Sequence, residues 1–185
     1  MDERKRQLRR EYRARAASLT PEYRARADRA IRGAVLCSRY WQQARGVFLY
    51  VSVGAEPDTR ALIAAALAAG KRVYVPRCLA DRTMEAVRIS DPAALRPGAF
   101  GIPEPPETAE SAAPGEIGLA LVPCVTATED GVRLGRGAGY YDRFLRRCAC
   151  PKLCLCYAEM LAPELPSEAH DVPMDAVVTE KGIVS

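Results

Sequence analysis

The stretch from residue 46 to residue 76 limits the folds open to this chain more than any other part of it. It begins with GVFLYVSV (46–53), a continuous apolar and β-branched run that is typical of a buried strand. The segment DTRALIAAALAAG (58–70) predicts a helix, with Asp58 or Thr59 as its N-cap and Gly70 as its terminator. KRVYVP (71–76) predicts a second short strand. A strand, a helix and a strand within about 30 residues indicate a parallel βαβ unit.

Other segments extend this unit into a larger sheet with helices. A helix is predicted over 3–17, where Leu8 and Tyr12 share a face, and a second begins with Thr20 as N-cap and Pro21 as its first residue. Residues 97–116 are rich in Pro, Gly, Ala and Glu and are predicted to form a loop. Further strands are predicted at MEAVRI (84–89), GLALVP (118–123), within CPKLCLCYA (150–158) and, as a last edge strand, DAVVTE (175–180).

The chain length and this order of elements together predict the fold class. At 185 residues, one domain is expected, spanning 1–185. We predict an α/β domain with a mostly parallel sheet flanked by helices on both faces, a Rossmann-like three-layer arrangement.

The composition excludes a membrane-spanning helix and favours a reducing compartment. The sequence holds no run of about eighteen apolar residues. Its start, MDERKRQLRR, is charged, and no apolar signal core follows it. Seven cysteines, an odd number, suggest reduced thiols, so we expect a cytoplasmic protein. Four of them, in CACPKLCLC (148–156), leave a zinc or thiol-redox site open, although alternation with leucine favours ordinary strand packing.

The charge of the chain is concentrated at its start. Residues 1–32 hold eleven Lys or Arg and five Asp or Glu, a net charge of +6, whereas the remaining 153 residues carry a net charge of −2. A basic segment on a near-neutral body indicates an anionic partner. Nucleic acid, membrane headgroups and a phosphorylated small molecule all have the required charge.

Three acidic segments follow predicted strands, and ligands of open α/β sheets bind beyond the carboxyl ends of the strands. These segments are GAEPDT (54–59), CVTATEDGVRLGRGAGYYD (124–142) and SEAHDVP (167–173). The second contains glycine at 135, 137 and 139, directly before a predicted helix start near Tyr140. Such a loop can bind phosphate through its backbone N–H groups. It is not a Walker A motif, and a flexible turn before a helix remains the alternative.

These segments also carry a family resemblance over nearly the whole chain. RLGRGAGYYDRFL (133–145), preceded by LVPCVTATEDG, resembles the signature of the 5-formyltetrahydrofolate cyclo-ligases, also called 5,10-methenyltetrahydrofolate synthetases. Five further motifs resemble the family in order: KRQLR (5–9), YVSVGAEPDT (50–59), VYVPR with MEAVRI, FGIPEPP (100–106) and HDVPMDAVVTE (170–180). The resemblance implies an ATP- and Mg²⁺-dependent ring closure of 5-formyltetrahydrofolate to 5,10-methenyltetrahydrofolate. ATP would phosphorylate the formyl oxygen, and ADP and phosphate would be released. We expect a monomer that acts on small molecules, with no nucleic-acid or membrane partner.

The resemblance assigns ATP binding to two segments of this chain. This sequence departs from the family pattern at Ala138, where many bacterial members have glycine. Alanine disfavours a positive φ, unlike glycine. Catalytic roles are implied for Arg133, Arg136 and Tyr140. The implied ATP-binding residues are Lys5, Arg6, Arg9, Arg133, Leu134, Gly135, Arg136, Gly137, Ala138, Gly139, Tyr140 and Tyr141.

Folate and magnesium are assigned to fewer residues. Val51, Glu56, Phe100 and Tyr140 would bind folate, and the Glu56 carboxylate can accept paired N–H bonds from the pterin edge. Asp142 and Asp171 would hold Mg²⁺. His170 has no implied catalytic role.

Purely structural interpretations remain open for several of these residues: a solvated helix face for Lys5 and Arg9, a helix start for Asp142, a loop for Asp171, the core for Val51 and a loop anchor for Phe100. At the level of function, the alternative is a nucleotide- or nucleic-acid-binding member of the same fold without catalytic activity. A phosphosugar isomerase or an acyl-CoA transferase of similar architecture is a further alternative.

Overall fold

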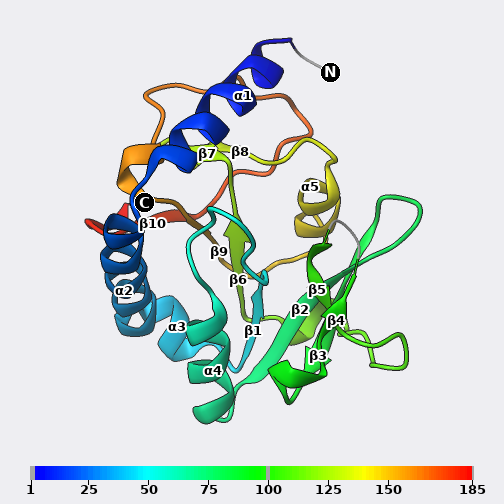
Figure 1. Ribbon diagram of the computed structural model, residues 1–185. Helices are drawn as coiled ribbons and strands as arrows, with labels where there is room; N and C mark the ends of the chain where they lie inside the picture. Colours follow the sequence, from blue (N-terminus) through cyan, green and yellow to red (C-terminus); the bar gives the residue numbers. More distant parts are fainter. Residues whose placement is uncertain (1–2, 99–100, 185) are drawn as a thin grey trace.

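A seven-stranded sheet forms the centre of the protein in the computed structural model, which describes residues 3–98 and 101–184 (Figure 1). Neighbouring strands are parallel except at the two ends, where β3 and β11 pair antiparallel with β2 and β10. The mostly parallel sheet is therefore confirmed. The strand order is β11 (Gly182–Val184), β10 (Ala176–Thr179), β9 (Lys152–Leu155), β6 (Leu119–Pro123), β1 (Gly46–Leu49), β2 (Arg72–Cys78) and β3 (Met84–Ile89).

The structure differs from the sequence-based expectation in three places. The strand predicted over 46–53 ends at Leu49, so residues 50–53 lie beyond its carboxyl end. The segment 175–180 forms β10 but is not the edge, because β11 pairs with its outer side. The predicted loop over 97–116 contains a small ribbon of β4 (Arg96–Pro97) and β5 (Pro103–Glu104), and a 3₁₀ turn (Pro114–Glu116). A further 3₁₀ turn (Pro92–Ala94) precedes it.

Helix starts follow the local chemistry that the sequence indicated. α2 (Pro21–Cys37) begins after Thr20, whose hydroxyl accepts a hydrogen bond from the Tyr23 amide at 3.2 Å. The short α3 (Arg39–Gln43) follows α2 directly. α4 (Arg60–Ala68) follows Thr59, whose side chain makes no capping hydrogen bond; Asp58 Oδ1 instead accepts from the Arg60 amide at 3.2 Å. Gly70, with φ +70°, allows the chain to turn into β2.

The helices lie in layers around the sheet. Figure 1 shows α2, α3 and α4 gathered on one side of it and α5 (Tyr140–Leu145) on the other. Phe144 of α5 packs on Phe48 of β1, with 4.8 Å between the ring centroids. The predicted three-layer α/β arrangement is confirmed. None of the helices in residues 3–98 and 101–184 is long and apolar enough to cross a lipid bilayer.

α1 (Glu3–Ser18) lies across the carboxyl-terminal end of the sheet (Figure 1). It buries Leu8 and Tyr12, the two residues predicted to share a face. It lies close to a hairpin of β7 (Thr126–Ala127) and β8 (Arg133–Leu134) and to a 3₁₀ turn (Ala158–Met160). The N-terminal helix is thus placed over the edge of the sheet at which ligands of this fold class bind.

Candidate active site

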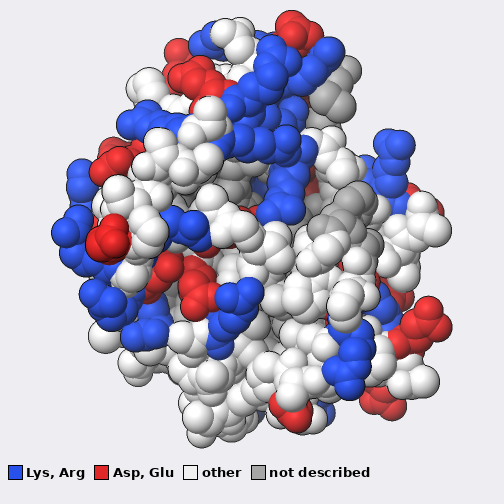
Figure 2. Space-filling view, viewed as in Figure 1, with Lys and Arg blue, Asp and Glu red and all other residues white. Residues whose placement is uncertain are grey.

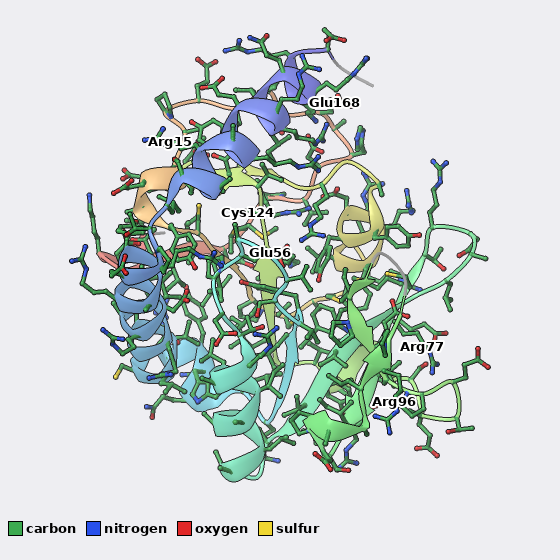
Figure 3. All side chains as sticks on the ribbon, in the orientation of Figure 1. Arg15, Glu56, Arg77, Arg96, Cys124 and Glu168 are labelled. Carbon is green, nitrogen blue, oxygen red and sulfur yellow. The ribbon has the colours of Figure 1, made fainter. Side chains whose placement is uncertain are left out.

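A cavity of about 580 Å³ opens between α1, the turn after β1, the glycine-rich segment and the loop at 168–171. Pro76 and Cys78 at the end of β2 and Pro123 at the end of β6 form part of its wall. The cavity therefore lies at the carboxyl ends of parallel strands, and the three acidic segments singled out in the sequence all reach it. Figure 3 shows Glu56 and Cys124 near the centre of the molecule, below α1, and Glu168 beside α1.

Most of the residues expected to form the site line this cavity. Arg6 and Val51 do not: the exposed Arg6 pairs with Glu3 at 3.0 Å, and Val51 lies in the core. Phe100 lies outside the described residues. The lining includes Lys5, Arg9, Glu56, Arg133, Leu134, Gly135, Arg136, Gly137, Ala138, Gly139, Tyr140, Tyr141, Asp142 and Asp171.

The glycine-rich segment uses backbone angles that only glycine adopts easily. Gly137 has φ +103° and Gly139, the residue before α5, has φ +73°. A Cβ on Gly137 would also come within 3.1 Å of the guanidinium carbon of Arg9. Ala138 has a negative φ, so the departure from glycine at this position introduces no backbone strain. The segment is therefore a defined turn packed against α1, and Arg9 Nε donates to the Gly135 carbonyl at 2.8 Å.

Two arginines place buried nitrogen atoms without partners at this cavity. In the described part of the chain, Arg9 Nη1 and Arg133 Nε are buried and have no hydrogen-bond partner. Burial and the nearby charges of Arg13 and Arg133 lower the pKa of Arg9. Arg133 is almost fully buried and also stacks over the Tyr141 ring, 5.7 Å from its centroid. Desolvated cations with unused donors favour a bound anion.

Two carboxylates face these cations. Asp142 Oδ1 accepts a hydrogen bond from Arg133 Nη2 at 2.7 Å. Asp171 Oδ2 accepts from Lys5 Nζ at 2.6 Å and from the Glu168 amide at 2.8 Å. Burial works against the charged form of Asp171, but these hydrogen bonds outweigh it and lower the pKa. Lys5 is therefore a buried, paired ammonium on the inner face of α1, not a solvated one.

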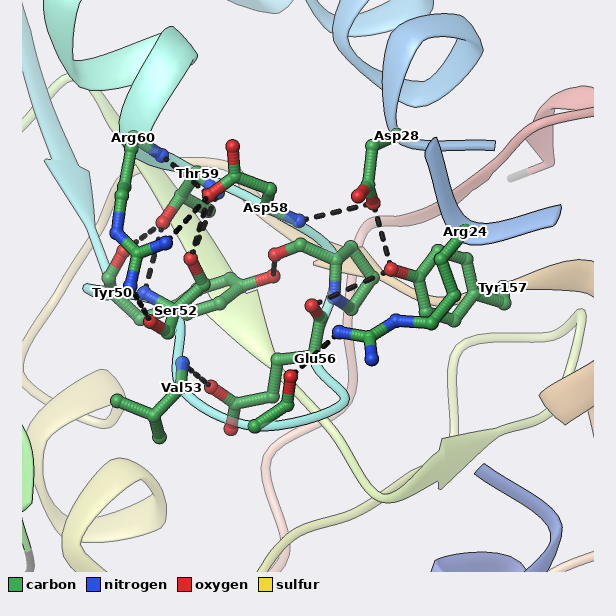
Figure 4. Close-up of polar contacts among 12 residues, drawn as sticks. Arg24, Asp28, Tyr50, Ser52, Val53, Glu56, Asp58, Thr59, Arg60 and Tyr157 are labelled. Carbon is green, nitrogen blue, oxygen red and sulfur yellow. Dashed lines mark hydrogen bonds and ion pairs between the residues drawn. The ribbon is translucent and has the colours of Figure 1, made fainter. Parts of the chain in front are cut away.

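Glu56 lies in the turn after β1, and the chain holds this turn at several points (Figure 4). Glu56 Oε2 accepts from the Val53 amide at 3.0 Å, and Arg24 donates to the Gly54 carbonyl at 2.6 Å. The Tyr157 hydroxyl donates to Asp28 Oδ1 at 2.7 Å, and the same oxygen accepts from the Asp58 amide. Burial raises the pKa of Glu56, although its ion pair with Arg136 at 2.7 Å opposes that shift. The carboxylate is thus pre-oriented and partly desolvated.

The cavity also includes residues that the sequence reading did not select. Arg13 continues the Lys5–Arg9 spacing by one more helical turn, so that spacing could have identified it. Met84 and Ile102 add apolar wall, and burial raises the pKa of the Cys78 thiol to about 11, which leaves it protonated at neutral pH. Cys78, Met84 and Ile102 come from β2, β3 and the 97–116 segment. No local motif connects these segments to the glycine-rich loop.

The outer surface above the cavity is basic. Figure 2 shows Lys and Arg side chains gathered along α1 and continuing into the hollow below it. The first helix of the positive segment, α1, therefore lies over the site, whereas the rest of that segment belongs to α2. A cavity with this charge favours small anionic ligands.

Comparison with known proteins settles the family. The sequence profile described as the 5-formyltetrahydrofolate cyclo-ligase family matches residues 1–180. The chain belongs to this family. A mouse 5-formyltetrahydrofolate cyclo-ligase is 30% identical over 189 residues, which cover 95% of this chain and 93% of the mouse protein. The enzyme of the same name from Mycolicibacterium smegmatis is 38% identical over 151 residues, 76% of this chain and 77% of that protein.

Solved structures agree with this family assignment. An NMR structure of Aquifex aeolicus 5,10-methenyltetrahydrofolate synthetase superposes with a TM-score of 0.87 at 31% identity, covering 97% of this chain and 91% of that chain. A Mycoplasma pneumoniae synthetase matches with a TM-score of 0.77 at 20% identity and supports the fold alone. The resemblance and the predicted fold are confirmed. Membership of a ligase family does not favour the alternatives of a non-catalytic module, an isomerase or an acyl-CoA transferase.

Proposed function

We propose that this cyclo-ligase family member converts 5-formyltetrahydrofolate to 5,10-methenyltetrahydrofolate, with hydrolysis of ATP to ADP and phosphate. The main support for this proposal is the set of side chains that line one cavity. It combines under-paired arginines, two carboxylates beside a glycine turn and the pre-oriented carboxylate of Glu56. A site for this reaction needs to bind a polyphosphate and a pterin next to each other.

The nucleotide phosphates are assigned to the glycine turn and the cations around it. Arg9 Nη1 and Arg133 Nε supply donors that the protein itself leaves unused. Arg136, on the same segment, has a half-exposed guanidinium and can reach a ligand in the cavity. Phosphoryl transfer depends on position and charge neutralisation more than on covalent chemistry, and these arginines supply both.

Asp142 and Asp171 suit a magnesium ion bound together with phosphates. Each uses one carboxylate oxygen toward Arg133 or Lys5, and the other oxygen of Asp171 lies 3.8 Å from His170 Nε2. Among the described residues, no group of three or more histidine, cysteine and acidic side chains is arranged to hold a metal, the cysteine-rich strand included. Mg²⁺ commonly takes one or two protein carboxylates and completes its shell with phosphates and water. Bound there, the ion would neutralise charge on the transferring phosphoryl group.

Folate is assigned to the part of the cavity at Glu56. The carboxylate, fixed by the Val53 amide, can accept two N–H bonds from the 2-amino-pyrimidinone edge of the pterin. Tyr140 and Ile102, both partly exposed, line the same cavity and provide surface for the ring system. The formyl oxygen then accepts the terminal phosphoryl group of ATP, and ADP is released. Folate nitrogen 10 attacks the activated formyl carbon and loses its proton to solvent, and phosphate leaves with the former formyl oxygen. Arg133, Arg136 and Tyr140 stabilise and position the phosphoryl group in this scheme.

The protein is further proposed to act in the cytoplasm as a monomer on small molecules. All seven cysteines are free thiols, which suits a reducing compartment. Leu79 and Ile183 are the large exposed apolar side chains of the described residues, so little apolar surface is available for a stable subunit interface.

To test the proposed function, the purified protein is mixed with 5-formyltetrahydrofolate, ATP and Mg²⁺. The absorbance of the methenyl product is followed, and ADP is measured in parallel. We expect product and ADP to appear in equal amounts, and neither to form when ATP or folate is left out. A folded protein that yields no methenyl product under these conditions contradicts the proposal. ATP binding without formation of ADP or methenyl product would instead favour the non-catalytic nucleotide-binding alternative.

A further inference from the structure

A second cavity of about 400 Å³ adjoins the first. It is lined by α1, the turn after β1 and the segment following β9, including Tyr12, Val53 and Tyr157. The residues that line both cavities are Arg13, Glu56, Cys124 and Arg136. The boundary between the two spaces is therefore built around the Arg136–Glu56 ion pair.

This ion pair joins two residues that the proposed function assigns to different substrates. Arg136 Nη2 donates to Glu56 Oε1 at 2.7 Å, across 80 positions of sequence. Arg136 belongs to the glycine segment assigned to the nucleotide, and Glu56 belongs to the turn assigned to folate. Arg136 therefore occupies the carboxylate assigned to folate, and Glu56 occupies the guanidinium assigned to the nucleotide.

The two ends of the pair differ in freedom. The Glu56 side chain is only 12% exposed, and its other oxygen is fixed by the Val53 amide. The Arg136 side chain is 47% exposed, and within residues 3–98 and 101–184 its guanidinium donates a hydrogen bond to Glu56 alone. The arginine is thus the end that can move, while the carboxylate stays in place. The desolvated carboxylate needs a donor, and a pterin N–H edge can replace the guanidinium.

We propose that the Arg136–Glu56 ion pair couples the binding of the two substrates. Folate takes Glu56 and releases Arg136 to the nucleotide phosphates, and a bound nucleotide that draws Arg136 away likewise frees Glu56 for folate. The inference rests on the proposed function, because it requires that both substrates bind in this cavity.

The Arg136–Glu56 ion pair should make the two substrates increase each other's affinity. Either substrate binding alone must break it, but the two together break it only once, so each increases the affinity of the other. Linkage requires the two increases to be equal. We expect about a tenfold increase, which corresponds to about 1.4 kcal/mol.

The test measures the affinity of a non-hydrolysable ATP analogue by calorimetry, with Mg²⁺, in the presence and absence of 5-formyltetrahydrofolate. The affinity should rise about tenfold when folate is present, and the reverse titration should give the same factor. In Arg136→Ala, whose altered side chain is half exposed, this factor should fall to about one. In Glu56→Gln, the analogue should bind about tenfold more tightly even without folate, because Arg136 is no longer held.

The controls use a second ion pair away from the cavity. Arg72 and Glu116 pair at 3.1 Å and are both partly exposed. Arg72→Ala and Glu116→Gln should leave the coupling factor unchanged. If both ligands bind to the unaltered protein but independently, or if Glu56→Gln leaves the analogue affinity unchanged, the coupling is refuted while the proposed function stands. If neither ligand binds, both are refuted.

Discussion

Replacement of Asp142 by asparagine separates two roles for this residue. The side chain accepts a hydrogen bond at 2.7 Å from Arg133, whose own side chain is only 3% exposed. Loss of one partner from a buried ion pair costs about 3–5 kcal/mol, because the remaining charge is left without compensation. Asparagine retains an oxygen acceptor at the same place, and Asp142 is 21% exposed, so water can screen part of the loss.

We therefore expect Asp142→Asn to lower the free energy of unfolding by about 1–2 kcal/mol. For a domain of this size that shift lowers Tm by about 2–8 °C. A residue that only begins a helix would lose no more than about 1 kcal/mol. Thermal or urea denaturation measures the difference, and Asp130→Asn, an exposed aspartate outside the cavity, is the matched control.

The same variant should lose far more activity than stability. Without the carboxylate charge beside the phosphates, turnover should fall by about 100-fold or more, and the Mg²⁺ concentration for half-maximal rate should rise. The assay is the methenyl absorbance change over a range of Mg²⁺ at a temperature where the variant is folded. Near-normal turnover with an unchanged Mg²⁺ requirement would refute the metal-binding role, and an unchanged Tm would refute the role in supporting Arg133.

Three further perturbations address other parts of the site. Gly137→Ala should lose about 1–3 kcal/mol of stability, because alanine is strained at φ +103° and its methyl group meets Arg9; a denaturation curve matching the unaltered protein would contradict this. Lys5→Ala should raise the KM for ATP by about tenfold or more, reflecting a lost charge-assisted contact, whereas Arg6→Ala, one position along the same helix, should leave it nearly unchanged; equal effects would contradict the placement of Lys5 at the phosphates. The Lys5 hydrogen bond, against the effect of burial, lowers the pKa of Asp171 below its unfolded value of about 3.9. Its stabilising contribution is thus present above that pH and is lost as pH falls through the lower folded pKa. Asp171→Asn should therefore reduce the acid sensitivity of unfolding below about pH 4, as measured by urea titration across pH 3–6.

Features that depend on local chemistry could be predicted from the sequence. Thr20 and Pro21 mark a helix start by their own backbone and hydroxyl chemistry, and the structure begins α2 there. Glycine at 137 and 139 indicated a turn with positive φ, which the structure contains. The three acidic segments met at one cavity because parallel strands end at the same edge of a sheet.

Features that depend on tertiary contacts could not be predicted in this way. Lys5 pairs with Asp171 across 166 positions, and Arg136 pairs with Glu56 across 80. Neither pairing has a local signal in the sequence. The sequence therefore indicated only a folate role for Glu56 and not its contact with the nucleotide segment. The edge strand β11 was missed because three residues beginning with Gly182 carry too little strand pattern.

In the proposed reaction, one cavity holds ATP and 5-formyltetrahydrofolate so that the phosphoryl group passes to the formyl oxygen. The most direct measurement uses 5-formyltetrahydrofolate labelled with ¹⁸O in the formyl group and follows the label by mass spectrometry. We expect the label to appear in the released inorganic phosphate, one atom for each methenyl product formed. Unlabelled phosphate accompanying the methenyl product would contradict it.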